Sequence, residues 1–312
     1  MARGLRFVPE GGSLVEVTVR TAQSRLLLRP SPVLNEIVLG VFGRAQRLYG
    51  VRVHFLICLS NHYHGLASVD DALQLARFMQ YVDSNLAREV NRLVKSSGPF
   101  WSTRYRAILV STEEAAQVDR LRYLLSNGVK ENLVDRVLDW PGVNSARAIL
   151  ESKPLKGYWF DRTQEFAARN RGEEYGRLTY ATEEEVVLTP LPCWAHLTPE
   201  QYRERVAGLV EEIEAEARAA RERTQIPALG VETILKQNPQ AQPKASKKSP
   251  APRFHAATKA VRQAFWEAYC AFVAAFREAA EKLKEGDRLA RFPVGSFPPG
   301  LPFVSSCPSL PP

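Results

Sequence analysis

Residues 51–69 read VRVHFLICLSNHYHGLASV, two β-prone runs that meet at Ser60 and Asn61. Both runs are rich in apolar residues, and a Ser-Asn pair between such runs is typical of a turn. We therefore expect two adjacent strands joined by this turn. His62 and His64 open the second strand, and because they stand two residues apart, their side chains point to the same face.

The segments around this strand pair predict one further strand before it and two long helices. Residues 13–20, SLVEVTVR, alternate apolar and polar residues, which indicates a half-buried strand. Residues 31–50 carry apolar residues near helical spacing and end in Gly50, a plausible C-cap. A second amphipathic helix follows the strand pair, and its apolar stripe consists of Phe78, Val82, Leu86 and Val90.

Another strand and helix complete the pattern. The sequence RYRAILV at 104–110 predicts a strand, and STEE at 111–114 has the form of a capping box that opens a helix through Asn127. The order strand–helix–strand–strand–helix–strand is that of a split βαβ sheet. The expected fold class is therefore α+β, an antiparallel ferredoxin-like core with a mainly helical C-terminal extension.

Composition shifts along the chain predict four regions. The core occupies residues 1–150, and a charged helical extension occupies 151–235. Residues 236–253 are rich in Pro, Lys and Ser and predict a disordered basic linker. A C-terminal helix and a proline-rich tail fill residues 254–312.

Charge and cysteine content limit the class of protein. The formal charge of +8 favours a polyanionic partner, nucleic acid first. The four cysteines form no CxxC pair, so neither a zinc ribbon nor a disulfide framework is indicated. Neither a signal peptide nor a membrane span is expected, which leads us to expect a protein of the cytoplasm, associated with the nucleoid.

The helix expected after residue 111 carries polar residues that could act together with the histidine pair. Asp119, Tyr123 and Asn127 fall four residues apart, stacked about one turn from each other. A tyrosine hydroxyl facing two imidazoles and a divalent cation could attack a phosphodiester. Taken alone, two histidines two apart are more often surface or structural residues, and a lone helical tyrosine usually flanks the core.

Motifs at matching order and spacing make the hypothesis more specific. Over roughly residues 1–150 the chain resembles the single-tyrosine HUH transposases, and most closely their REP-associated tyrosine transposase branch. The resemblance lies in HFLICLSNHYHGLASV (54–69), FMQYVDSNLAREVNRL (78–93), SSGPFWSTRYRAILVST (96–112) and LRYLLSNGVKENLVDRVLDWP (121–141). That family has a ferredoxin-like HUH endonuclease core and takes part in DNA transposition, a form of DNA recombination carried out by mobile elements.

The resemblance implies a site and a reaction. His62 and His64 correspond to the HUH metal-binding pair, Tyr123 to the nucleophile, and Asn127 to a polar metal ligand one turn later. The implied cofactor is a divalent metal, Mg²⁺ or Mn²⁺. The implied activity cuts and rejoins single-stranded or hairpin DNA through a 5′-phosphotyrosyl intermediate. Tyr81 and Tyr105 are rival tyrosines, and Tyr105 is better interpreted as structural or DNA-contacting.

The segment PFWSTRYR combines aromatic and basic residues in the way that single-strand DNA contacts require. The candidate DNA-binding residues are Trp101, Arg104, Tyr105 and Arg106. A packed tryptophan with solvated arginines is the alternative interpretation. The resemblance leaves both a monomer and a homodimer open.

Three positions depart from the family pattern, and two other functions stay open. Asn127 is followed by Gly128 where members have Pro, Ser60 stands where many have Pro, and Gly65 where an aliphatic residue is common. None of these departures removes a catalytic group. The first favours the main alternative, a domesticated or decayed protein that binds hairpin DNA without cutting it. A zinc hydrolase acting on a small phosphoester is the other, but the sequence has no third His or carboxylate at convincing spacing.

Overall fold

The computed structural model describes residues 5–9, 11–243 and 252–300. It is a mixed α+β structure built on a five-stranded sheet in the order β2-β3-β1-β4-β7. Neighbouring strands are antiparallel, except that β7 joins β4 in parallel. The bounds of these strands are β1 Ser13–Arg20, β2 Arg52–Leu59, β3 His62–Val69, β4 Arg106–Val110 and β7 Phe254–His255.

The order of the first six strands and α-helices confirms the prediction from the sequence: β1, α1 (Pro32–Tyr49), β2, β3, α2 (Ala72–Leu93), β4. The Ser31 hydroxyl caps α1 by accepting a hydrogen bond from Leu34 N at 3.2 Å. Gly50 ends α1 as expected, in the left-handed conformation at φ 65° that glycine tolerates. Ser60 and Asn61 form the turn between β2 and β3.

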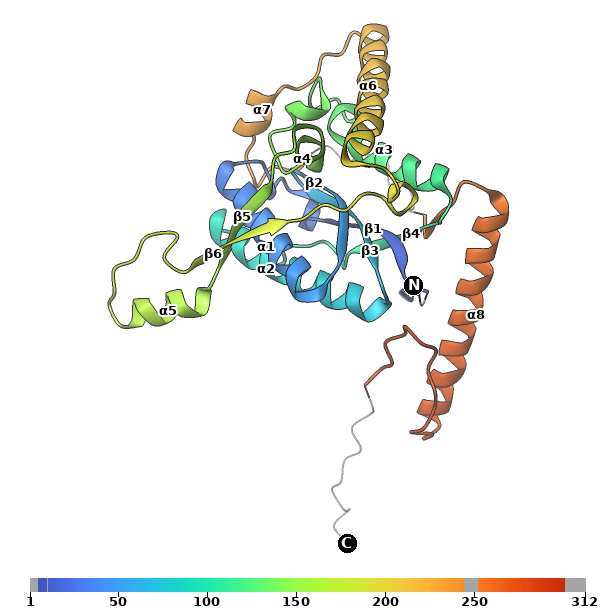
Figure 1. Cartoon of the computed structure of the whole chain (residues 1–312). Helices are drawn as coiled ribbons and strands as arrows, with labels where there is room; N and C mark the ends of the chain where they lie inside the picture. Colours follow the sequence, from blue (N-terminus) through green and yellow to red (C-terminus); the bar gives the residue numbers. More distant parts are fainter. Residues whose placement is uncertain (1–4, 10, 244–251, 301–312) are drawn as a thin grey trace.

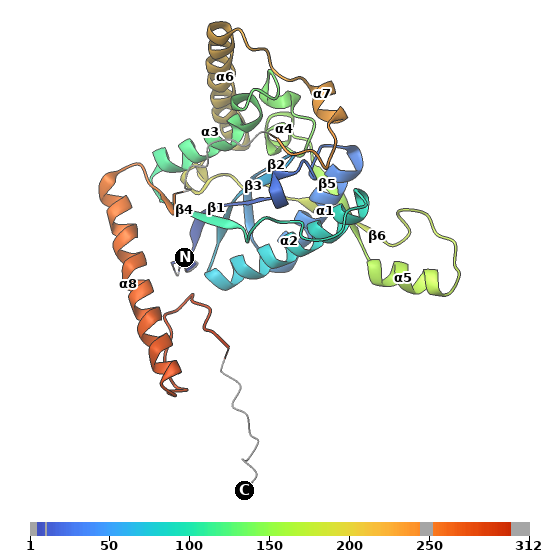
Figure 2. The same cartoon turned by 180° about the vertical axis from the view of Figure 1, so that it is seen from behind.

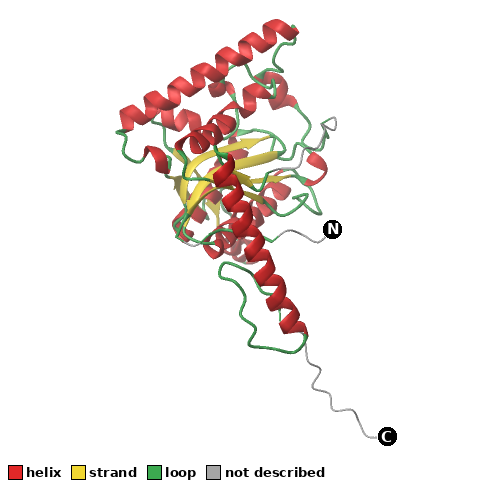
Figure 3. Cartoon of the chain, turned by 90° about the vertical axis from the view of Figure 1, so that its right-hand side faces the viewer, coloured by secondary structure: helices red, strands yellow, loops and turns green. Residues whose placement is uncertain are grey.

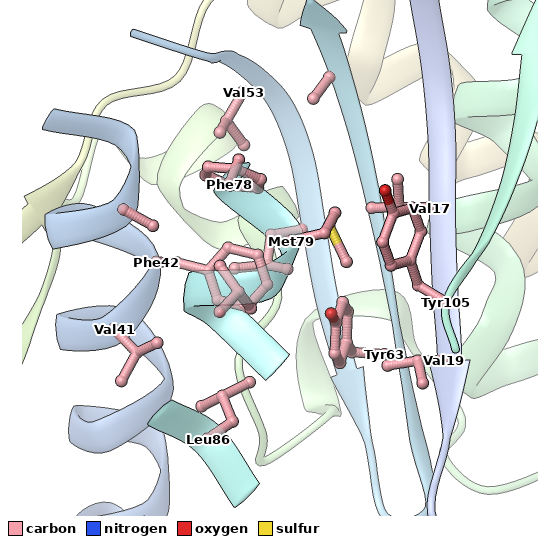
Figure 4. Close-up of a cluster of buried hydrophobic side chains, with 14 of the residues drawn as sticks. Val17, Val19, Val41, Phe42, Val53, Tyr63, Phe78, Met79, Leu86 and Tyr105 are labelled. Atoms are coloured by element: carbon pink, nitrogen blue, oxygen red, sulfur yellow. The ribbon is translucent and has the colours of Figure 1, made fainter. Parts of the chain in front are cut away.

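Helices cover both faces of the sheet. Figure 1 shows α1 and α2 against one face, whereas α3 (Glu114–Lys130), α4 (Ser145–Glu151), α6 (Pro199–Thr224) and α7 (Val231–Lys236) gather on the other side. The view from behind shows the same layers (Figure 2). The α1–α2 layer holds the larger apolar cluster, in which Tyr63 meets Phe42 edge-on at a ring-centroid distance of 5.4 Å (Figure 4). The predicted stripe of α2 is fully buried there.

The start of α3 differs from the predicted capping box. The helix begins at Glu114 with Glu113 as its N-cap and no side-chain cap bond. The Ser111 hydroxyl instead donates to the Glu113 carboxylate at 2.7 Å. That carboxylate also accepts hydrogen bonds from the backbone N–H groups of Ala257 and Thr258, at the start of the last helix. A tertiary contact has therefore replaced the local cap, and α3 runs past Asn127 to Lys130.

The extension after residue 150, predicted as mainly helical, also contains a two-stranded hairpin. Strands β5 (Leu155–Phe160) and β6 (Ala181–Val186) pair in antiparallel orientation on either side of α5 (Arg162–Asn170). The hairpin packs against α1, and Glu184 accepts hydrogen bonds from Arg44 and Arg47 of that helix. Short 3₁₀ helices complete the connections: η1 Ala22–Ser24, η2 Val137–Asp139 and η3 Pro192–Trp194.

The contact between α1 and β5 requires a glycine, which gives a prediction. A Cβ at Gly40 would overlap the carbonyl group of Tyr158 in the crossing strand. We expect Gly40→Ala to lower the free energy of unfolding by about 2–3 kcal/mol, because the new methyl group would press against the backbone of β5, which cannot move away as a side chain could. Gly208 in α6 has no atom near such a Cβ, so Gly208→Ala should stabilise by about 0.5–1 kcal/mol. Urea denaturation of both variants measures the difference; equal stabilities would contradict the packing.

The C-terminal part adds β7 and α8 (Lys259–Lys284) at the β4 edge of the sheet. Helix α8 extends away from the body (Figure 3) and packs Tyr269 and Phe272 against Phe7. Residues 244–251 of the predicted linker and 301–312 of the predicted tail lie outside the described residues. In the parts of the chain that the structure describes, no helix is both long and apolar enough to cross a membrane.

Candidate active site on the histidine face of the sheet

The pleat of β3 places His62 and His64 on the sheet face that α3 covers. Their rings lie 5.0 Å apart between centroids. Tyr63 points to the opposite face, as period-two alternation requires, and its hydroxyl donates to Asp83 at 2.6 Å in the α1–α2 layer. The prediction that both imidazoles share one face is confirmed.

Both imidazoles have one ring nitrogen held by an oxygen of the protein. His64 Nδ1 lies 2.7 Å from Glu16 Oε1, and His62 Nδ1 lies 2.6 Å from Asn61 Oδ1. Since both partners are acceptors, each Nδ1 is the ring nitrogen that donates, and in the neutral tautomer the lone pair lies on Nε2. A hydrogen bond from one ring nitrogen to a protein oxygen fixes the orientation of a histidine whose other ring nitrogen binds a metal.

Glu16 links the histidine pair to α3 and was not predicted from the sequence. It lies on β1 with only 1% of its surface exposed. One carboxylate oxygen binds His64 and the other binds Arg120 of α3. Burial alone would raise the pKa of this carboxyl, but the His64 and Arg120 contacts outweigh it and hold the pKa below its ordinary value.

Tyr123 lies beside the histidine pair, as expected. Its ring centroid is 5.8 Å from that of His64, at an interplanar angle of 82°. The Arg120 guanidinium carbon lies 4.4 Å from the ring centroid, and Lys130 Nζ lies 5.0 Å from it. Burial and the charge of Glu16 raise the pKa of the phenol, whereas Arg120 opposes them. The phenol is therefore protonated at neutral pH.

Asn127 and Asp119, the other polar residues of the predicted helix face, make other contacts. Asn127 is buried, and its amide nitrogen donates to the backbone oxygens of Tyr123 and Leu124 within α3. Asp119 is exposed and pairs with His255 Nε2 of β7 at 3.0 Å. Of the three residues, Tyr123 therefore lies against His64, Asn127 bonds within its own helix, and Asp119 pairs with β7.

The atoms available as metal ligands decide whether a divalent cation fits at the histidine pair. Burial, together with the neighbouring His64 and Arg20, lowers the pKa of His62 well below its ordinary value, so the His62 imidazole is neutral. Among the described residues, no group of three His, Cys, Asp or Glu side chains could hold a metal. The two free Nε2 atoms therefore fit a cation whose remaining ligands are oxygens from other sources, such as a phosphodiester and water.

The two aromatic DNA-binding candidates lie in the opposite layer. The Trp101 indole packs on Tyr63 at 5.7 Å between centroids and donates to Asp83 O at 2.9 Å. Tyr105 is 7% exposed and lies in the apolar cluster of Figure 4. Arg6 stacks on its ring and donates to its hydroxyl. Both side chains stabilise the α1–α2 layer, which agrees with the packing alternative for Trp101 and the structural role for Tyr105.

The two basic candidates remain at the surface. Arg104 and Arg106 are both exposed. Arg106 pairs with Thr18 across β4 and β1, and Thr18 pairs with His64 across β1 and β3. Directly opposed residues share a face, so Arg106 lies on the histidine face, two strands away. Arg20, which the sequence did not suggest, lies opposite His62 on the same face.

Comparison with known proteins gives structures of transposases and no sequence match. No family model and no curated protein matches the sequence. One similar solved structure is that of a REP-associated tyrosine transposase bound to a REP hairpin, with 15% identity, a TM-score of 0.39, and coverage of 61% of this chain and 100% of that chain. Another is a candidate transposase from Deinococcus radiodurans R1, with 16% identity, a TM-score of 0.28, and coverage of 39% and 95%.

Proposed function

We propose that this protein is a metal-dependent endonuclease and strand transferase of transposase type that acts on single-stranded DNA through Tyr123. One observation carries the proposal: the Tyr123 ring lies against His64, which itself neighbours His62. A phenol beside two oriented imidazoles would supply the nucleophile and two metal ligands for tyrosine attack on a phosphodiester. The exposed Arg20 and Arg106 on the same face supply positive charge for the DNA backbone.

The proposed reaction exchanges one phosphoester bond for another. The Tyr123 oxygen bonds to phosphorus while the bond from phosphorus to the 3′ oxygen breaks. The phenol loses its proton to water, and the leaving 3′ oxygen takes one up to become a free hydroxyl. A divalent cation such as Mg²⁺ or Mn²⁺ on the Nε2 atoms of His62 and His64 would polarise the phosphoryl oxygens.

The chain's own residues prepare this step. Glu16 orients His64 through its Nδ1, and Asn61 orients His62 in the same way. The Arg120 guanidinium, fixed by Glu16, lies over the Tyr123 ring, where its charge favours the phenolate. The reverse reaction, attack by a 3′-hydroxyl on the phosphotyrosine, would rejoin strands without another energy source.

The sheet order supports a finer description of the core. Strands in the order β2-β3-β1-β4, with α1 and α2 on one face, are consistent with the split βαβ, ferredoxin-like arrangement. In this arrangement the other face stays available for a site under α3.

The test is a covalent-adduct assay on the full chain. Purified protein is mixed with hairpin DNA that carries single-stranded extensions, in Mg²⁺ or Mn²⁺, and run on a denaturing gel. We expect a protein–DNA band that chelator abolishes, as well as loss of the band in His62→Ala and His64→Ala. Labelling at the 5′ and 3′ ends distinguishes a 5′-phosphotyrosyl link from a 3′ link. Absence of any adduct over a range of hairpins would refute the cleavage proposal.

A second function is favoured by the position of the Asn127 amide. The side chain is buried and its Nδ2 atom donates to the backbone of α3, so Asn127 is fixed inside its own helix and only its Oδ1 atom is left to bind a cation. A protein that binds hairpin DNA without cutting would fit such a site. Tight hairpin binding without nicking, unchanged by chelator, would select this alternative.

A further inference from the structure

Next to Tyr123 lies a groove that the proposed cleavage reaction does not use. It runs between α3 and α6 and has a volume of about 690 Å³. This volume lies within the range of roughly 300–1,000 Å³ that small-molecule and cofactor sites occupy. Tyr123 lines the groove and also contacts His64. The groove is therefore continuous with the candidate catalytic centre.

The groove has an apolar wall. Val129 of α3 and Ile213 and Ala217 of α6 line it. Small side chains at Ala217 and Ala220 leave space between the two helices, which otherwise pack side by side at this end of the molecule (Figure 1). Such a wall can take one face of an unpaired base, whereas a base inside a duplex cannot enter between two helices.

Positive charge predominates along the rim. Four basic side chains line the groove against two acidic ones, Asp119 and Glu216. Both acidic groups are paired, Asp119 with His255 and Glu216 with Arg122. Two further arginines are also paired with carboxylates, Arg120 with Glu16 and Arg221 with Asp135. Lys130 is exposed and forms no ion pair with any residue that the structure describes, and Arg221 Nη1 is a buried atom without a hydrogen-bond partner there. Among the described residues, the rim thus offers an anion one basic side chain without an ion pair, that of Lys130.

We propose that the α3–α6 groove binds a nucleotide adjacent to the scissile phosphate, with its unpaired base against the apolar wall and its phosphate toward Lys130. This inference rests on the proposed function, because it assigns the groove to the same DNA strand. The scissile phosphate lies at Tyr123, and the neighbouring nucleotide continues into the groove. The α6 extension accordingly contributes to substrate binding.

The test fills the groove and measures binding separately from cutting. Ala217→Trp blocks the wall, and Ala219→Trp places the same side chain on the exposed side of α6 as a matched control. Fluorescence anisotropy is measured with a hairpin that has single-stranded extensions and with the same hairpin made blunt. We expect Ala217→Trp to weaken binding of the extended hairpin about tenfold, in line with the loss of one stacked base, while binding of the blunt hairpin and all binding by Ala219→Trp stay unchanged.

A second variant avoids any disturbance of the helix packing. Lys130→Gln removes the rim charge, and Lys236→Gln removes an exposed lysine of α7 as its control. Lys130→Gln should reduce the salt dependence of binding to the extended hairpin by about one phosphate contact, whereas Lys236→Gln should not. A photoreactive thymidine beside the cut position should crosslink to residues of the groove.

The outcomes separate the two proposals. If the wild-type protein forms the adduct but neither Ala217→Trp nor Lys130→Gln changes binding of the extended hairpin, the groove assignment is overturned and the cleavage proposal stands. Loss of extended-hairpin binding in these variants, together with no adduct from wild-type protein, would support the groove and refute cleavage. Equal loss of blunt and extended hairpin binding in Ala217→Trp, or crosslinks that map elsewhere, would also overturn the assignment.

Discussion

Replacing Tyr123 with phenylalanine is expected to abolish the covalent DNA adduct. The substitution removes one oxygen and leaves the ring against His64 and beneath Arg120. Because the proposed mechanism has no other nucleophile, we expect adduct formation to fall by on the order of 10⁴-fold or more, to below detection. DNA binding should change by less than about threefold, since a single hydroxyl contributes little to backbone contacts. The measurement is the denaturing-gel assay together with anisotropy on the same hairpin.

Two other tyrosines serve as matched controls for this prediction. Tyr81 lies on α2 and packs edge-on against Tyr49, and Tyr105 binds Arg6 in the same layer, across the sheet from the histidines. Both Tyr81→Phe and Tyr105→Phe should still form the adduct. An adduct in Tyr123→Phe, or its loss in Tyr105→Phe alone with the fold intact, would show that the nucleophile is assigned to the wrong residue.

Local periodicity predicted the elements and the geometry of the histidine pair. Two-residue alternation along β3 is a backbone property, so the shared face of His62 and His64 required no tertiary information. The helical stripe of α2 and the Gly50 C-cap are likewise local. Tyr123 was expected from its position in the motif, and its contact with His64 depends on α3 crossing the sheet at the correct place.

Residues that join distant segments could not be predicted in this way. Glu16 stands on the polar face of an alternating strand, which would be the solvent face of a bare sheet. Because α3 covers that face, Glu16 is buried and binds groups 48 and 104 residues away. A carboxylate among β-branched neighbours was the available signal, and it became informative only with the position of α3.

Packing favours the structural role for Trp101 and Tyr105. Aromatic residues beside arginines are typical both of single-strand contacts and of buried layers with stacked guanidinium groups. The buried partners Tyr63, Asp83 and Arg6 come from three other segments, so the sequence around residue 101 alone could not distinguish these roles. The β5–β6 hairpin was missed because β6, ATEEEV, is charged and, in the described part of the chain, pairs with β5 alone.

Removing the Glu16 carboxylate should have the largest effect on stability. In Glu16→Ala, His64 Nδ1 and Arg120 lose their buried partner, and we expect the free energy of unfolding to fall by about 3–5 kcal/mol. Glu16→Gln keeps one acceptor oxygen but turns an amide N–H₂ toward a second donor. The free energy of unfolding should therefore fall by less than in Glu16→Ala. Because His64 would no longer be oriented, adduct formation by Glu16→Gln should fall by about 10–100-fold. Urea denaturation and the adduct assay at several Mn²⁺ concentrations measure the two effects.

Glu184 provides a control of the same chemistry. It is also a buried carboxylate that binds two basic groups, Arg44 and Arg47, but it lies on the β5–β6 hairpin. Glu184→Gln should therefore lower stability without changing the Mn²⁺ dependence of adduct formation. If Glu16→Gln and Glu184→Gln behaved alike in the adduct assay, Glu16 would have only a structural role.

The pH dependence of stability gives an independent test of the Glu16 contacts. Its pKa in the folded protein lies below the ordinary value of 4.5, so the folded state binds fewer protons than the unfolded state just below that pH. The stabilisation by Glu16 is therefore complete above about pH 4.5 and is lost as the pH falls through the folded pKa. Glu16→Gln has no such titration, so the difference in unfolding free energy between wild type and Glu16→Gln should shrink on acidification. A difference that stays constant from neutral pH to pH 3 would mean that His64 and Arg120 do not hold the ionised carboxylate in the way the structure places them.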